Sequence, residues 1–124
     1  MAGTNPVRWF EIYVNDMARA KRFYEEVLQV TLQDMSMPSI EMHAFPMEMD
    51  GPGAAGALCR MEGFSGGGSS TLVYFSCADC AVEAARVEAA GGKLHKPKQS
   101  IGEYGFMAIA FDTEGNMFGL HSNA

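Results

Sequence analysis

The sequence has 124 residues, of which 48% are hydrophobic and 19% are charged, and its net charge at pH 7 is −6. This length predicts one domain with a single core, and no apolar run approaches the roughly 20 residues of a membrane span. The acidic balance argues against a nucleic-acid-binding surface, which needs a basic patch. No apolar signal segment precedes the first predicted strand, so we expect a cytoplasmic protein that binds neither membranes nor nucleic acid.

Residues 9–28, WFEIYVNDMARAKRFYEEVL, predict a strand, a tight turn and an amphipathic helix. Side chains of a strand alternate between its two faces. Phe10, Ile12 and Val14 therefore form one apolar face, which suits packing under a helix. Asp16 is well placed to cap that helix, and apolar residues recur at helical spacing over 17–28.

The opposite face of the same strand mixes aromatic side chains with a carboxylate. Trp9, Glu11 and Tyr13 alternate with the apolar set and share this face. Burying an unpaired carboxylate in a dry core is costly. We therefore expect this face to line a solvent-reached cavity, or Glu11 to be paired within it.

Three further strands are predicted in the first half of the chain, at 29–34, 39–45 and 54–61, with a turn at 50–53. Alternation over the second of these strands places Glu41, His43 and Phe45 on one face. Five of the ten methionines lie in residues 35–49. Thioether side chains re-pack around varied shapes, so this stretch is either an adaptable ligand wall or a loosely packed strand or subunit interface.

The opening pattern returns after a glycine-rich linker at 62–70, EGFSGGGSS. In the strand expected at 71–77, Leu72 and Tyr74 stand 63 positions after Trp9 and Glu11, and Asp79 caps a second helix expected over 80–90. Gly91 and Gly92 close that helix. Strands follow at 93–96, ended by Pro97, at 104–111 and at 117–121, with a tight turn at 112–116. The repeat predicts two βαβββ units, at about 7–61 and 71–122, within one domain of residues 1–124.

The three cysteines, Cys59, Cys77 and Cys80, are an odd number. Cys77 and Cys80 have the CxxC spacing of a redox pair or of half a zinc site. No second such motif accompanies them, and the segment spans a strand end and a helix start. We interpret both as buried thiols without a special role.

The opening segment, VEAAGGK at 87–93 and FDTEGNMFGL at 111–120 together resemble the vicinal oxygen chelate superfamily, which includes glyoxalase I, extradiol dioxygenases and bleomycin-resistance proteins. The similarity extends over essentially the whole chain and is greatest with the short glyoxalase-like proteins. It implies an α+β fold in which two tandem βαβββ units, related by a pseudo-twofold, form an incomplete barrel-like curved sheet with a cavity. It also implies a homodimer.

In the metal-dependent members of this superfamily, four side chains from the first and last strands of the two units bind one divalent ion. The matching positions in this sequence are Trp9, Leu72, Gly119 and approximately Gly56. None of these four offers a ligating side chain. The resemblance therefore implies that the usual metal site is absent, and we expect no metal and no other cofactor.

Three functions stay open on these residues. The first is a metal-free protein that binds a small molecule, similar in plan to the bleomycin-resistance proteins. The second is a glyoxalase-like lyase or isomerase, or a dioxygenase relative, that uses a relocated metal or a Glu–His acid–base pair such as Glu11 with His121. The third is a structural or regulatory module with a filled barrel. The residues expected to contact a ligand are Trp9, Glu11, Tyr13, His43, Leu72, Tyr74, Tyr104, Gly119 and His121.

Overall fold

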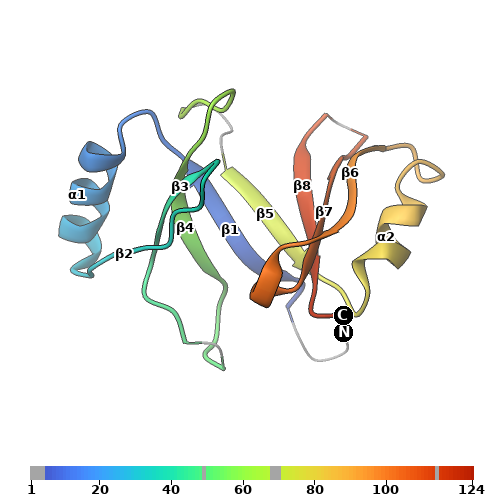
Figure 1. Cartoon of the computed structure of the whole chain (residues 1–124), viewed down its shortest axis with the longest axis horizontal. Helices are drawn as coiled ribbons and strands as arrows, with labels where there is room; N and C mark the ends of the chain where they lie inside the picture. The colour runs from blue at the N-terminus through green and yellow to red at the C-terminus, as the bar shows by residue number, and fades with distance from the viewer. Residues whose placement is uncertain (1–4, 49, 68–70, 114) are drawn as a thin grey trace. The chain divides into compact units, whose positions relative to one another are not determined.

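A computed structural model describes residues 5–48, 50–67, 71–113 and 115–124 (Figure 1). Its elements follow the order β-α-β-β-β twice along the chain, with a short 3-10 turn in the second half. This confirms the predicted α+β class with two βαβββ units. Residues 68–70 of the predicted linker, Met49 of the methionine-rich stretch and Glu114 of the predicted turn lie outside the described residues.

The chain forms two compact units. Residues 9–71 make the N-terminal unit, and residues 72–124, together with the leader up to residue 8, make the C-terminal unit. Neither helix of the described segments is long and apolar enough to cross a membrane.

The N-terminal unit contains one helix and a mixed sheet of four strands in the order β2-β3-β4-β1. β1 runs parallel to β4, while β4 with β3 and β3 with β2 are antiparallel. The second strand starts at Gln33 rather than at the predicted Gln29, because Gln29 takes a left-handed conformation (φ 53°) that ends the helix. The elements are β1 (Val7–Tyr13), α1 (Met17–Leu28), β2 (Gln33–Asp34), β3 (Glu41–Ala44) and β4 (Ala55–Arg60).

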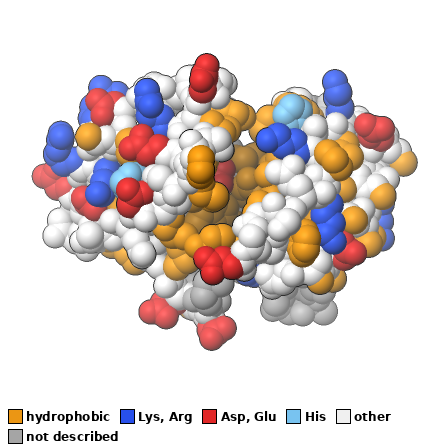
Figure 2. Space-filling model, viewed as in Figure 1, with side chains coloured by type: hydrophobic (Ala, Val, Ile, Leu, Met, Phe, Trp, Pro, Cys, Tyr) orange, Lys and Arg blue, Asp and Glu red, His pale blue; other side chains and the backbone are white. Residues whose placement is uncertain are grey.

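The predicted bounds of the first helix are confirmed at Met17–Leu28. The carboxylate of Asp16 accepts a hydrogen bond from the backbone N–H of Arg19 at 3.0 Å, which satisfies one free donor of the first turn. Beneath α1 lies an apolar core of Val14, Met17 and Leu58. Ile12 packs against this core, as its alternation with Glu11 predicted. Basic and acidic side chains lie close together over α1 (Figure 2).

The C-terminal unit repeats this plan, with its sheet in the order β5-β8-β7-β6. Its core contains Cys80, Ala84, Ala108 and Leu120, all between the sheet and the helix. β5 and β8 are parallel, and the other two pairs are antiparallel. The elements are β5 (Thr71–Ser76), α2 (Cys80–Arg86), β6 (Lys93–Ser100), η1 (Gly102–Tyr104), β7 (Phe106–Phe111) and β8 (Met117–Ser122).

The second helix was predicted over 80–90. Its predicted C-terminal end is wrong, because α2 ends at Arg86. The chain continues in turns up to Gly92, whose N–H donates to the carbonyl of Val87. Residues 88–91 are all exposed. A segment with no apolar face to bury gains little from tertiary packing, and packing supplies most of the stability of a short helix.

The predicted strand end at Pro97 is also wrong, because β6 runs on to Ser100. β6 is the outer strand of its unit and pairs only with β7 among the described strands, so a residue without an N–H is tolerated there. The pairing register shifts between Lys96 and Gln99, on either side of the proline. On the next strand, Tyr104 belongs to the 3-10 turn and pairing begins at Phe106.

Candidate functional site

The centre of the N-terminal candidate site is the carboxylate of Glu11 on β1, on the face of the sheet opposite α1. Glu11 is 5% exposed. The indole N–H of Trp9 donates to Oε2 of Glu11 at 3.1 Å, and the hydroxyl of Tyr13 donates to Oε1 at 2.7 Å. The period of two along the strand places both donors beside the carboxylate. The structure therefore brings together three of the predicted site residues as one Glu11 cluster, namely Trp9, Glu11 and Tyr13.

The electrostatics of this cluster are set by burial. Loss of solvent raises the pKa of Glu11, and the hydrogen bonds from Tyr13 and Trp9 oppose the rise without cancelling it. Burial, together with the nearby Glu11 carboxylate, raises the pKa of the Cys59 thiol far above its usual range. A carboxylate has about four lone-pair positions. Trp9 and Tyr13 occupy two of these positions on Glu11, so the carboxylate can still accept a hydrogen bond from a further donor.

Small and aromatic side chains of the same unit border the Glu11 cluster. β4 runs beside β1 with Ala57 opposite Glu11 and Cys59 opposite Tyr13. The ring of Tyr13 stacks on Phe64, with centroids 4.9 Å apart and an interplanar angle of 25°. Sequence reasoning missed Ala57, Cys59 and Phe64, since only the pairing register of β1 with β4 and the course of the following turn identify them.

His43 lies on the other face of the N-terminal sheet. It pairs with Leu58, a member of the core beneath α1, so the structure separates it from Glu11. Its Nε2 is 3.7 Å from the carboxylate of Glu41, and its Nδ1 is buried without a hydrogen-bond partner among the described atoms. Neighbouring Asp34 has a lowered pKa, mainly because Ser36 donates to it and to a smaller degree because of His43.

In the C-terminal unit, alternation places Leu72, Tyr74, Gly119 and His121 on the face opposite α2. Tyr74 pairs with Gly119, and its ring fills the position that a Cβ atom at residue 119 would occupy. The Nε2 of His121 lies 2.6 Å from the backbone carbonyl of Tyr104, which requires the tautomer with a proton on Nε2. Leu72 is buried, whereas the side chain of Tyr104 is 48% exposed.

The pairing registers revise one of the four positions at which the superfamily's metal ligands were expected. In the C-terminal unit Gly119 stands opposite Tyr74. Tyr74 is the counterpart of Glu11 in the repeat, and Glu11 stands opposite Ala57. The fourth position is therefore Ala57 and not Gly56. Gly56 faces the ring of Phe10 on the helix side of the sheet, where an added Cβ would lie 2.5 Å from a ring carbon.

The side chains at these four positions do not fit a divalent ion. An indole, a methyl group, an isobutyl group and a glycine hydrogen supply no lone pair for coordination. The space above Gly119 is taken by the Tyr74 ring, so a ligating side chain there would collide with it. Across the described residues, no group of three or more His, Cys, Asp or Glu side chains is arranged to hold a metal.

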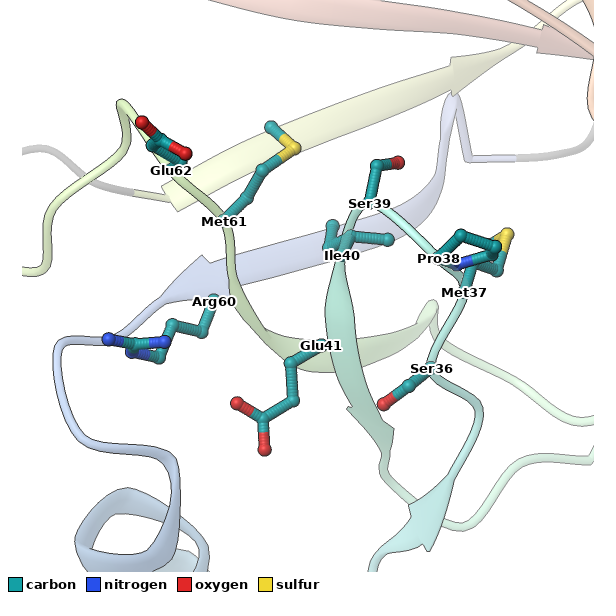
Figure 3. A pocket seen from close by; sticks show the side chains of 9 residues that line it. All are labelled: Ser36, Met37, Pro38, Ser39, Ile40, Glu41, Arg60, Met61 and Glu62. Atoms are coloured by element: carbon teal, nitrogen blue, oxygen red, sulfur yellow. The ribbon is translucent and has the colours of Figure 1, made fainter.

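A hollow of about 320 Å³ lies at the ends of β3 and β4 (Figure 3). Met37, Ile40 and Met61 supply its apolar wall, and Glu41 and Arg60 extend from paired strands beside it. The methionine-rich stretch thus contributes Met37 to a hollow, while Met42 from the same stretch is buried in the sheet.

A second hollow of about 400 Å³ lies at the start of α1, between the end of β1 and the loop at Gly66 and Gly67. Tyr13 contributes to its wall, and the N–H of Gly66 donates to the side chain of Asn15 at 2.8 Å. Of the described residues, neither Trp9 nor Glu11 lines either of these two hollows.

All three cysteines are free thiols. Cys80 is fully buried and packs in the core under α2, with Cys77 against the same core. Burial and the neighbouring Glu83 raise the pKa of Cys77 to about 11. A raised thiol pKa is the opposite of what a reactive CxxC pair needs, in agreement with the interpretation of these residues as packing thiols.

Comparison with known proteins identifies one family. The sequence model described as the Glyoxalase/Bleomycin resistance protein/Dioxygenase superfamily matches residues 7–120. No curated protein matches the sequence significantly.

Solved structures with the same fold include several epimerases. Methylmalonyl-CoA epimerase from Mycobacterium tuberculosis has a TM-score of 0.71 at 15% identity, covering 100% of this chain and 93% of that one. A methylmalonyl-CoA epimerase solved with methylmalonyl-CoA and an ammonium ion has a TM-score of 0.69 at 13% identity, covering 96% and 94%. A hypothetical protein from Bacillus halodurans C-125 has a TM-score of 0.71 at 10% identity, covering 95% and 94%. At these identities the likeness shows the fold alone.

Proposed function

The chain belongs to the glyoxalase/bleomycin resistance protein/dioxygenase superfamily, and we propose that within it the protein binds a small organic molecule without a metal, at the Glu11 cluster. One observation carries the proposal: a buried carboxylate is held by two donors of its own strand on the sheet face that no helix of its unit covers. Burying a carboxylate in that setting lowers the stability of the folded protein. A role in recognising a ligand would explain why the buried carboxylate is present.

The chemistry of the cluster defines the ligand class. The free lone pairs of Glu11 favour a molecule with a hydrogen-bond donor or a positive charge, and the net charge of −6 favours the same choice. Trp9 and Tyr13 add aromatic surface that suits a planar or cationic group. The epimerase relative solved with methylmalonyl-CoA supports a small organic ligand for this fold. In the C-terminal unit, Leu72, Tyr74, Gly119, Tyr104 and His121 stay predicted ligand contacts. His43 lies on the opposite face of the N-terminal sheet from Glu11, so it is not a contact of this cluster.

A second candidate is a glyoxalase-like lyase or isomerase, and the raised pKa of Glu11 favours it. A carboxyl group whose pKa is raised exchanges its proton closer to neutral pH, which suits a general acid or base. His43 is not its partner, since it lies on the opposite face of the sheet. The ring of His121 is already engaged by the carbonyl of Tyr104. Glu11 is therefore the residue to test for proton transfer.

The remaining parts of the proposal are a cytoplasmic location and a homodimer. The three free thiols support a reducing compartment. The outer strand of a sheet has unpaired backbone N–H and C=O groups, and a second subunit can cover them. C2 dimers are the commonest soluble oligomers.

The test is a thermal-shift screen with a panel of organic cations, aromatic amines and acyl-CoA thioesters, followed by titration of each hit. Trp9 is the sole tryptophan of the sequence and donates to Glu11, so its fluorescence should respond to a ligand there. Glu11→Gln should weaken binding by about 1–3 kcal/mol, or roughly five- to 150-fold. Glu88→Gln, an exposed exchange in the other unit, is the matched control.

If the Glu11→Gln protein binds every hit as tightly as the wild type does, the proposed binding at the Glu11 cluster is overturned. Turnover of a thioester by the wild type, lost in Glu11→Gln, would favour the isomerase instead. A screen that yields no hit and no fluorescence change would leave the third reading, a structural module, as the answer.

A further inference from the structure

A short loop after β4 brings one aromatic ring onto the Glu11 cluster. We call residues 61–67 the Phe64 loop. It opens with a tight turn in which the N–H of Phe64 donates to the carbonyl of Met61 at 3.1 Å. Gly63 takes a left-handed conformation in this turn (φ 90°), which glycine adopts without steric strain. The turn starts directly after β4, and β4 pairs with β1. The position of Phe64 is therefore set by the strand that neighbours the Glu11 cluster.

Three contacts hold the Phe64 loop against the end of β1. The ring of Phe64 stacks on the ring of Tyr13, with centroids 4.9 Å apart and an interplanar angle of 25°. The backbone N–H of Gly66 donates to the side chain of Asn15 at 2.8 Å. The backbone of Gly66 also lies so close to β1 that an added Cβ would be 3.0 Å from the carbonyl oxygen of Tyr13. The loop is thus fitted to Tyr13 by its backbone as well as by its aromatic ring.

The stacked ring of Tyr13 is the one that carries a donor of the cluster. Tyr13 is 6% exposed, and its hydroxyl donates to Oε1 of Glu11 at 2.7 Å. The hydroxyl stands at the far end of the ring, so a small rotation of the ring lengthens and bends this hydrogen bond, which weakens it. Stacked aromatic rings prefer defined relative orientations. A ring fixed against one face of Tyr13 therefore limits how the phenol can turn.

We propose that Phe64 is a positioning residue of the Glu11 cluster: stacked on Tyr13, it fixes the phenol that donates to Glu11. Phe64 acts on the carboxylate through Tyr13. With the phenol fixed, the carboxylate keeps one orientation and presents its remaining lone pairs in one direction. The inference deepens the proposed binding at the Glu11 cluster and rests on it only for the effect on a ligand. The hydrogen bond itself is measurable without a ligand.

Positioning and simple shielding by Phe64 predict opposite changes at Glu11. The hydrogen bond from Tyr13 lowers the pKa of Glu11, whereas burial raises it. A variant that loses the positioning of Tyr13 should therefore raise the pKa of Glu11, and one that only admits water should lower it. Tyr13 on β1 and Cys59 on β4 are the titratable groups that face Glu11 in the described part of its unit. Burial and the Glu11 carboxylate hold the pKa of the Cys59 thiol far above its usual range, so Cys59 stays neutral while Glu11 titrates.

The experiment is a titration of the Trp9 fluorescence of the full chain from pH 3 to pH 9. Trp9 is the sole tryptophan and donates to Glu11, and Glu11→Gln identifies the transition by abolishing it. Phe64→Leu keeps an apolar side chain and removes the flat ring. We expect it to raise the midpoint by about 0.5–1 pH unit. In a Tyr13→Phe background the same exchange should leave the midpoint unchanged, because no phenol remains to be positioned.

Matched variants separate the role of the ring from other effects. Phe64→Tyr keeps the flat ring and should titrate as the wild type does. Phe23→Leu removes a 56% exposed ring from α1 of the same unit and should also leave the midpoint unchanged. Asn15→Ala removes the acceptor for the N–H of Gly66 without altering either stacked ring, and should give a smaller rise. Circular dichroism checks that each variant folds, and Asn15→Ala keeps the test if Phe64→Leu does not fold.

A midpoint that falls in Phe64→Leu would show that Phe64 acts as a shield, and the proposal is then overturned. An unchanged midpoint overturns it as well, as does an equal rise in the Tyr13→Phe background. Hits from the ligand screen are titrated separately. Phe64→Leu should weaken their binding no more than Tyr13→Phe does, and should add nothing to it in the double variant. If no ligand binds, the proposed function fails, while the pH titration still decides the role of Phe64.

Discussion

The hydrogen bond from Tyr13 to Glu11 gives the sharpest test of the candidate site. Tyr13→Phe removes a donor at 2.7 Å from a buried carboxylate. A hydrogen bond to a charged group contributes about 1.5–3 kcal/mol, so we expect a loss of that size in unfolding free energy at pH 8. In a Glu11→Gln background the same exchange removes a bond between neutral groups, worth about 0.5–1.5 kcal/mol. The double-mutant cycle should therefore give a coupling energy of roughly 1–2 kcal/mol at pH 8.

The pH dependence of the same variants gives an independent check. Burial raises the pKa of Glu11 above its ordinary value of 4.5, so the folded protein holds this proton more tightly than the unfolded chain. The corresponding stability is fully present below pH 4.5 and is lost as the pH rises through the folded-state pKa. Glu11→Gln does not titrate, so the wild type should lose stability relative to it as the pH rises. Each unit by which the pKa is raised corresponds to about 1.4 kcal/mol.

The assay is urea unfolding at pH 4, 6 and 8, followed by circular dichroism and by the fluorescence of Trp9. Glu88→Gln serves as the control for removal of an exposed carboxylate. A wild type that gains stability over Glu11→Gln as the pH rises would refute the reasoning, since the hydrogen bonds would then outweigh burial. A coupling energy near zero would mean that the Tyr13 hydroxyl does not donate to Glu11 in solution.

Three further outcomes are expected. Gly119→Ala should lower the free energy of unfolding by about 1–3 kcal/mol, because the added methyl group overpacks against the ring of Tyr74. In urea unfolding, the double variant with Tyr74→Ala should lose less stability than the sum of the two single variants. EDTA should leave the melting temperature unchanged, because the positions of the superfamily's metal ligands supply no donors; a midpoint that drops and is restored by zinc, nickel or manganese would contradict this. Cys77, with a pKa of about 11, should react with iodoacetamide at pH 8 roughly a hundredfold more slowly than a free thiol. Glu83→Gln should speed that reaction, and an unchanged rate would show that the Glu83 carboxylate does not act on this thiol.

Much of the fold could be predicted because local signals and the repeat agree. Asp16 caps α1 and the apolar spacing continues to Leu28, so both bounds of the helix were readable. Alternation along β1 placed Ile12 under the helix and Glu11 on the other face. These features depend on periodicity within one element, which the sequence contains in full.

The parts that could not be predicted depend on how elements pair. The β1–β4 register makes Ala57, not Gly56, the neighbour of Glu11, and nothing along either strand encodes a shift of one residue. Alternation correctly grouped His43 with Glu41, but only the pairing with Leu58 shows that their face is the one under α1. Pro97 reads as a strand end until β6 is known to be an outer strand.

The two pairing registers show the same arrangement of small and large residues in both units. In each unit, the last-strand position that would supply a metal ligand is small, with Ala57 in one and Gly119 in the other. In each unit its partner on the first strand is large, with Glu11 opposite Ala57 and Tyr74 opposite Gly119. In the C-terminal unit the Tyr74 ring fills the place of a Cβ at residue 119, so the large residue on the first strand requires glycine on the last. In each unit a polar side chain, Glu11 or Tyr74, thus lies two residues beyond the first-strand position of a superfamily metal ligand, and in the N-terminal unit it is an ionisable carboxylate.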